Sequence, residues 1–165
     1  MFRRILLAID GSAGSDVALS HATALARESS ATVQVLHVNE LVVGGRGVAL
    51  RTTDDAVALV ADAVRELRAA GVTAGGTVTV AHYRRVPQRI AEVAHERSAE
   101  VIVLGSQRGG RLSRLFAHQV RERTMRLTAL PVLTAPAPLA VVGTGGFTVP
   151  DDLHRPSDRE PSALS

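Results

Sequence analysis

Short apolar runs alternate along this chain with longer segments of helical period, and this alternation constrains the fold most. The apolar runs cover residues 5–9, 33–38, 77–81, 101–104 and 131–135. Between them, apolar residues recur every three or four positions, as in helices with one buried side. Parallel strands need crossovers of about helix length, and these crossovers are right-handed. The sequence therefore predicts an α/β three-layer sandwich in which five strands alternate with four helices.

The apolar content of each run predicts its place in the sheet. Residues 5–9 and 101–104 are apolar throughout, as strands buried on both faces are, whereas residues 77–81 alternate like an edge strand. We therefore expect a doubly wound, five-stranded parallel sheet of order 3-2-1-4-5, which changes direction between strands 1 and 4. Ligands of such sheets bind at the carboxyl ends of the strands beside that change, where Asp10 and Gly105 stand.

Cap and turn residues predict where the helices begin and end. Asp54 or Asp55 is expected to cap a helix that carries Val57 on its buried side and stops at Gly71. Pro87 suits the first turn of the next helix. Leu127 is expected on the buried side of the last helix.

The composition changes near Pro136, because five of the seven prolines lie at or after this position. The polar, glycine-containing segment that follows buries too little apolar surface to offset its ordering entropy. We therefore predict one globular domain over residues 1–135 and a mostly flexible tail over residues 136–165. Within this tail, residues 139–142 (LAVV) are a candidate for a short extra strand.

The residues that are missing exclude several classes of function. All 19 basic residues are arginine, so a Walker-type phosphate lysine and a Schiff-base lysine are excluded. No cysteine is present, which excludes disulfides and thiolate metal sites. A net charge of +3 with few, scattered aromatic residues argues against nucleic acid as a partner. Neither a membrane span nor a signal-peptide pattern is found, so no membrane partner and a cytoplasmic location are expected.

Two readings stay open at each candidate ligand segment. The carboxylate of Asp10 accepts hydrogen bonds either from a base or sugar, or from the turn that begins the next helix. The segment GSQRGGR at residues 105–111 either cradles an anion with its amides and Arg108, or is a solvated turn before a basic helix. The GGRG run at residues 44–47 is a weaker phosphate-loop candidate, because it does not open a helix.

Histidine spacing and nucleophile patterns indicate no catalytic site. The six histidines show no metal-ligand spacing, and His21, His37, His82 and His95 are read as structural or solvated. No Ser, His and Asp arrangement stands out, so neither a resident metal nor nucleophilic catalysis is expected.

Four segments resemble the universal stress protein family over about residues 3–135. They are ILLAIDGS at the start, VQVLHV at residues 33–38, AEVIVLGS at residues 99–106 and RERTMRLTALPVLTA at residues 121–135. The resemblance implies an adenine-nucleotide-binding α/β fold with the sheet order predicted above. It also implies a homodimer and an unidentified protein partner, although Pro136 and Pro138 limit further ladder pairing after the last strand.

The resemblance assigns the adenine end of the site to residues that match the family pattern. Asp10 matches the acidic residue that contacts the base, and Val38 matches an apolar residue beside it. Ala8 and Leu104 line the same region, and Val120 aligns without a gap near the other end of the site.

The phosphate pattern of the nucleotide-binding members is less well matched. It consists of glycine, two residues, glycine, nine residues, glycine, and then serine or threonine. Gly105 fits the first glycine, but the next positions fall on Arg108, His118 and Gln119. A loop shift of one residue lets Gly109 serve for Arg108. A histidine side chain at position 118 occupies volume that triphosphate oxygens would need.

These departures lead to two functional hypotheses. In the first, the chain is a non-enzymatic stress-response protein whose ATP site is weak, changed in phosphate preference or absent. In the second, it binds ATP with its accompanying Mg²⁺ and hydrolyses it slowly, with Arg108 and Gln119 making the phosphate contacts. A remote third class, an adenylyl transferase, lacks any acid–base pair that the sequence identifies.

Overall fold

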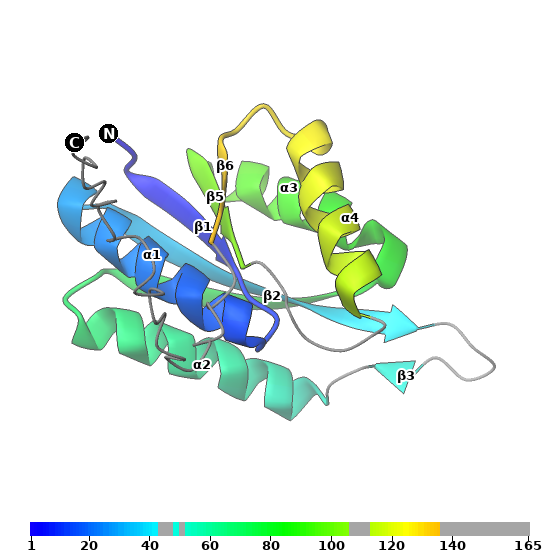
Figure 1. Cartoon of the computed structure of the whole chain (residues 1–165). Helices are drawn as coiled ribbons and strands as arrows, with labels where there is room; N and C mark the ends of the chain where they lie inside the picture. The colour runs from blue at the N-terminus through cyan, green and yellow to red at the C-terminus, as the bar shows by residue number, and fades with distance from the viewer. Residues whose placement is uncertain (43–47, 50–51, 106–112, 136–165) are drawn as a thin grey trace, which may run out of the picture.

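The computed structural model describes residues 1–42, 48–49, 52–105 and 113–135. Of these, the side chains of residues 42, 48–49 and 113–119 lie outside the described part. The described residues form one twisted sheet with helices on both faces (Figure 1). The three-layer α/β sandwich expected from the sequence is therefore confirmed.

The parallel strands lie in the predicted order. They are β1 (Arg4–Ala8), β2 (Thr32–Val42), β4 (Ala74–His82), β5 (Val101–Leu104) and β6 (Val132–Thr134). Pairing gives the order β4-β2-β1-β5-β6, which is 3-2-1-4-5 when the parallel strands alone are numbered. The two uniformly apolar strands, β1 and β5, are central neighbours, and the alternating strand β4 lies at an edge.

Strand β2 is longer than its apolar run predicted. Its pairing with β1 stops where Ala8 meets Leu36, but its pairing with β4 continues to Leu41. Its last two residues also pair antiparallel with β3 (Val48–Ala49), which falls in the segment read as a connection. A two-residue strand carries no detectable period, so β3 could not be predicted from the sequence.

The helices begin and end close to the predicted positions. They are α1 (Ala13–Ser29), α2 (Thr53–Ala69), α3 (Val86–Glu96) and α4 (Ser113–Leu127), with a 3-10 turn η1 (Tyr83–Arg85) before α3. Gly71 follows α2 with a φ of 81°, and Pro87 lies in the first turn of α3, as expected. The predicted cap of α2 was wrong. Thr52 caps it by accepting a hydrogen bond from the amide of Asp55 at 3.1 Å, and Asp54 and Asp55 lie in the first turn.

Alternating residues of each central strand enter two separate cores. Leu7, Val35 and Val103 belong to the core under α1 and α2. Leu6, Leu36 and Ile102 belong to the core under α3 and α4. Each strand is therefore buried on both faces, which is why the central runs are apolar throughout.

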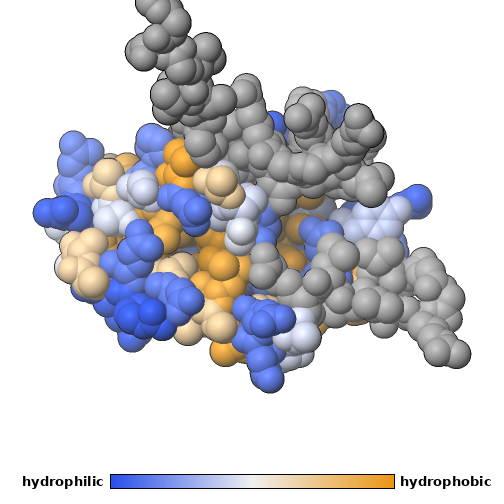
Figure 2. Space-filling model, turned by 60° about the horizontal axis from the view of Figure 1, so that its bottom comes forward, coloured by the Kyte–Doolittle hydropathy of each residue, from blue (hydrophilic) through white to orange (hydrophobic). Residues whose placement is uncertain are grey.

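Two expected core residues are exposed instead. Val57 is 51% exposed, because its neighbour Ala56 takes the buried position on α2. Leu127 is 52% exposed and is the last residue of α4. On the face shown in Figure 2, exposed hydrophobic residues lie among the hydrophilic ones. Among the described helices, none has the length and apolar content needed to cross a membrane.

Candidate functional site

The direction change of the sheet brings the ends of β1 and β5 side by side. Ala8 pairs with Leu104 at the last position of both strands, so Asp10 and Gly105 follow adjacent strand ends. Beyond β1, the amide of Ile9 donates to the carbonyl of Leu36 at 2.9 Å, which joins this segment to β2. The place predicted for a ligand site is therefore built from three neighbouring strands, β2, β1 and β5.

Asp10 closes the turn between β1 and α1. Its Oδ1 accepts hydrogen bonds from the amide of Ser12 at 2.9 Å and from Oγ of Ser15 at 2.6 Å. The amide of Asp10 in turn donates to Oγ of Ser15 at 2.9 Å. Gly11 has a φ of 76°, which glycine adopts without strain. The turn-closing role is therefore confirmed.

Ser15 was not singled out from the sequence, although it holds Asp10 in place. Its side chain is only 4% exposed, and its hydroxyl both donates to and accepts from Asp10. The sequence feature that could have indicated this role of Ser15 is its position near a helix start, five residues after the carboxylate at the strand end. Serine so close to a helix start usually indicates capping, and here it fixes the carboxylate instead.

Gly105 is needed for packing against α1. A Cβ atom at this position would lie 2.6 Å from the carbonyl carbon and oxygen of Gly14, and 2.8 Å from the amide nitrogen of Ser15. These are backbone atoms of a helix, so they cannot move aside as a flexible side chain would. This glycine therefore has a structural role that does not depend on any phosphate.

Four of the predicted nucleotide residues meet in one apolar cluster. Val38 and Leu104 are buried in the core between the sheet and α3–α4, and Ala8 and Val120 pack against it while partly exposed. They come from β2, β5, β1 and α4, which are far apart in the sequence. The structure thus places Ala8, Val38 and Leu104, which the resemblance assigns to the adenine end, in one apolar cluster with Val120, and Asp10 follows just beyond the end of β1.

The phosphate end falls mostly outside the described residues. Arg108 and Gly109 belong to residues 106–112, of which nothing is described. His118 and Gln119 lie on the backbone of α4 immediately before Val120, but their side chains are not described. The assignment of these four residues to phosphate therefore stays a prediction.

A second carboxylate, that of Glu40, lies on β2 near Asp10. Burial raises the pKa of the Glu40 carboxyl above its ordinary value, and the negative charge of Asp10 raises this pKa further. Glu40 follows Val38 by two residues, so both side chains are on the same face of β2. The sequence reading stopped this strand at residue 38 and therefore missed Glu40.

His37 joins β2 to the end of β1. It is 5% exposed, and its Nδ1 donates to the carbonyl oxygen of Ile9 at 2.9 Å. The structural reading of this histidine is supported. Within the described residues, His37 Nε2 and Ser12 Oγ are buried atoms with no hydrogen-bond partner. Buried polar atoms of this kind are ordinarily satisfied by water or a ligand.

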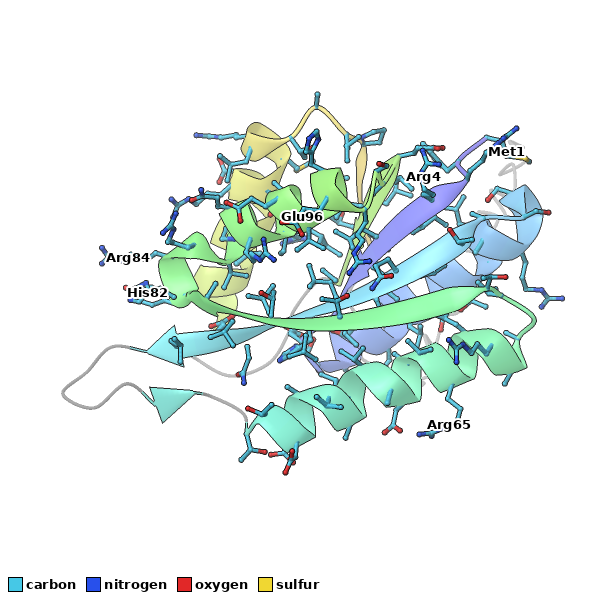
Figure 3. The ribbon with its side chains drawn as sticks, turned by 180° about the vertical axis from the view of Figure 1, so that it is seen from behind. Met1, Arg4, Arg65, His82, Arg84 and Glu96 are labelled. Atoms are coloured by element: carbon cyan, nitrogen blue, oxygen red, sulfur yellow. The ribbon has the colours of Figure 1, made fainter. Side chains whose placement is uncertain are left out.

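A group of aromatic and basic side chains lies at the carboxyl end of β4. The rings of His82 and Tyr83 are 4.6 Å apart, and Arg84 lies 5.5 Å from the Tyr83 ring and donates to its hydroxyl at 2.7 Å. Figure 3 shows His82 and Arg84 projecting outward at the end of the molecule opposite Met1 and Arg4. Strand β2 lies between β4 and β1, and His82 pairs with Leu41 of β2, so this group lies at the same edge of the sheet as Asp10, one strand away from β1.

The family model for universal stress proteins matches residues 1–136, which is most of the chain. The chain belongs to the universal stress protein family. Within the described residues of this family member, no group of three or more histidine, aspartate or glutamate side chains is arranged to hold a metal ion.

Solved structures of this family share the fold. A universal stress protein from Burkholderia pseudomallei is 25% identical, with a TM-score of 0.62 over 81% of this chain and 96% of the other. One from Archaeoglobus fulgidus, in complex with dAMP, is 24% identical, with a TM-score of 0.59 over 81% and 98%. A third, in complex with cAMP, is 18% identical, with a TM-score of 0.61 over 82% and 98%. A search of curated proteins found no match to this chain.

Proposed function

We propose that this chain is a non-enzymatic regulatory protein that binds adenine nucleotides carrying one phosphate in preference to ATP. The observation that carries the proposal is the convergence of Ala8, Val38, Leu104 and Val120 in one apolar cluster beside Asp10. Apolar walls with a few fixed polar groups are what small-ligand sites consist of. A cytoplasmic location and the homodimer implied by the family belong to the same proposal.

The adenine end fits a purine base chemically. The exocyclic amine of adenine is a hydrogen-bond donor, and an ionised carboxylate accepts hydrogen bonds without donating any. Ser12 and Ser15 hold the Asp10 carboxylate in one orientation, so little side-chain entropy remains to be lost when a base binds. Related proteins with this fold were solved with dAMP and with cAMP, and each of these ligands has an adenine base and a single phosphate.

The phosphate end supports a preference for few phosphates. The pattern that carries ATP in the family needs glycine at two positions where this chain has Arg108 and His118. A histidine side chain restricts the close approach of phosphate to a helix backbone, whereas glycine permits it. Arginine supplies a charged fork that suits a single phosphate group. We propose Mg²⁺ binding only together with ATP.

Calorimetric titration of the full chain with AMP, cAMP, ADP and ATP tests this proposal. We expect AMP or cAMP to bind at least about tenfold more tightly than ATP, a difference of about 1.4 kcal/mol. The outcome that would overturn the proposal is tight ATP binding that R108A abolishes, because Arg108 would then be a triphosphate contact. If none of the four nucleotides binds, the proposal is also overturned. The apolar cluster beside Asp10 would then serve only the packing of the core.

A further inference from the structure

An apolar groove lies between α1 and the edge strand β6, on the face of the sheet opposite the apolar cluster of the candidate site. Its volume is about 380 Å³. Its apolar lining consists of Ala24, Leu25, Val103, Leu133 and Ala135. His21 and Glu28 of α1 line it as well and supply polar groups. A concavity of this size and composition accommodates several aliphatic side chains.

The groove arises because the two faces of β6 are covered unequally. Leu133 pairs with Val103, whose side chain enters the core under α1 and α2, so Leu133 is on that same face of the sheet. Val103 is 1% exposed, whereas Leu133 is 44% exposed. On the opposite face, Val132 packs against the core under α3 and α4. The described part of α1 thus shields β5 much better than β6.

The chain leaves the described domain at this groove. Ala135 follows β6, lines the groove and is 4% exposed, and its amide donates to the carbonyl of Leu104 at 2.9 Å. The next residues are Pro136, Ala137 and Pro138, and then the apolar run LAVV at residues 139–142. Four residues of extended chain span at most about 14 Å, so this run begins within reach of the groove.

We propose that residues Leu139–Val142 dock in the groove between α1 and β6 of their own chain. Pro136 and Pro138 have no amide hydrogen to donate, so they disfavour an extension of the strand ladder and keep the short linker stiff. The apolar run then covers Leu133 through side-chain contacts. The polar, glycine-containing sequence after residue 142 offers no second apolar run of this length.

A second copy of the chain is the competing occupant, and effective concentration decides between the two. A segment tethered by a short linker is present at an effective concentration of about millimolar or more. A second copy at micromolar concentration therefore needs a roughly thousandfold stronger contact to displace it.

Disulfide trapping in the full chain tests the docking, because the natural sequence has no cysteine. The A24C/V141C variant places one thiol in the groove and one in the run. The control variant E96C/V141C places the first thiol on α3, which lies on the other side of the sheet (Figures 1 and 3). We expect the disulfide within one A24C/V141C chain to form at least about tenfold faster than in the control.

Two outcomes would overturn the proposal. One is an equal rate of intramolecular disulfide formation in both variants. The other is a disulfide that joins two A24C/V141C chains, which would assign the groove to a second copy. A variant pair gives an independent readout in case trapping distorts the fold. V141D should raise the binding of a hydrophobic dye and lower the melting temperature, whereas T144D should change neither.

Discussion

The ends of β1 and β5 are adjacent, yet they constrain a ligand in different ways. After β1, the carboxylate of Asp10 is held by Ser12 and Ser15, so a polar group is fixed in position. After β5, Gly105 lies so close to the backbone of Gly14 that a Cβ would not fit, and it presents no side chain at all. The end of β1 therefore contributes a fixed hydrogen-bonding carboxylate, whereas the end of β5 contributes close packing of the backbone. A family motif that begins with Gly105 is read as a phosphate loop, but its first residue is required by the fold alone.

The largest effect is expected from the β5 end. The variant G105A forces a Cβ against the backbone of α1, which we expect to lower the free energy of unfolding by about 3 kcal/mol. Urea denaturation measures this loss. G75A is the matched control, because its Cβ meets only the flexible end of Gln34, at 3.1 Å. Equal losses in the two variants would show that the contact between Gly105 and Gly14 is not what holds this strand end.

The next effect is expected at the β1 end. The variant D10A removes the acceptor for the Ser12 amide and for the buried hydroxyl of Ser15, and we expect a loss of about 2 kcal/mol. D16A is the control, since Asp16 is exposed in the first turn of the same helix and its removal costs about 0.5 kcal/mol. Denaturation of D10A at the same midpoint as D16A would contradict the turn-closing role.

A conservative change separates ligand binding from turn closure. The variant D10N keeps an oxygen that accepts from Ser12 and Ser15 but removes the charge. We expect the melting temperature to change little and the affinity for AMP to fall by about tenfold, or about 1.4 kcal/mol. The same titration of D16N should give the natural affinity. If D10N binds AMP as well as the natural protein does, Asp10 serves the turn only.

The smallest effect concerns the pH dependence of stability. Burial and the charge of Asp10 raise the pKa of Glu40 in the folded protein, so the folded state holds this proton more tightly than the unfolded state does. Stability from this group is therefore lost as the pH rises from its ordinary pKa of 4.5 through the raised value. E40Q should be more stable than the natural protein above this window and should show a flatter pH profile. Denaturation midpoints across pH 4 to 8 measure this, and identical profiles would contradict it.

Much of the fold could be predicted because burial on two faces leaves a simple signal. Residues 5–9 and 101–104 are apolar throughout, and this predicted that β1 and β5 are central neighbours. The continuation of β2 to Val42 and the existence of β3 could not be predicted, because pairing with a partner strand sets them. The buried side of α2 was misplaced by one residue at Val57, since small residues such as Ala56 fill core positions equally well.

The site was only partly predictable for a related reason. Strand ends placed Asp10 and Gly105 beside the direction change, and the structure puts both residues there. Val38 and Leu104 were assigned through the family resemblance, and their role in a nucleotide site stays a prediction. The hydrogen bonds of Ser15 and the close approach of Gly105 to Gly14 arise from how α1 sits on the sheet. Such tertiary contacts leave no period in the sequence.

The central claim is that this family member retains an adenine end and has lost the room for a triphosphate. The most direct test is the ratio of the ATP and AMP dissociation constants in the natural chain and in H118G/Q119S. We predict that AMP binds more tightly to the natural chain and that the double variant gains at least about tenfold in ATP affinity with unchanged AMP affinity. The claim is contradicted if the natural chain already binds ATP more tightly than AMP, or if the double variant leaves the ratio unchanged.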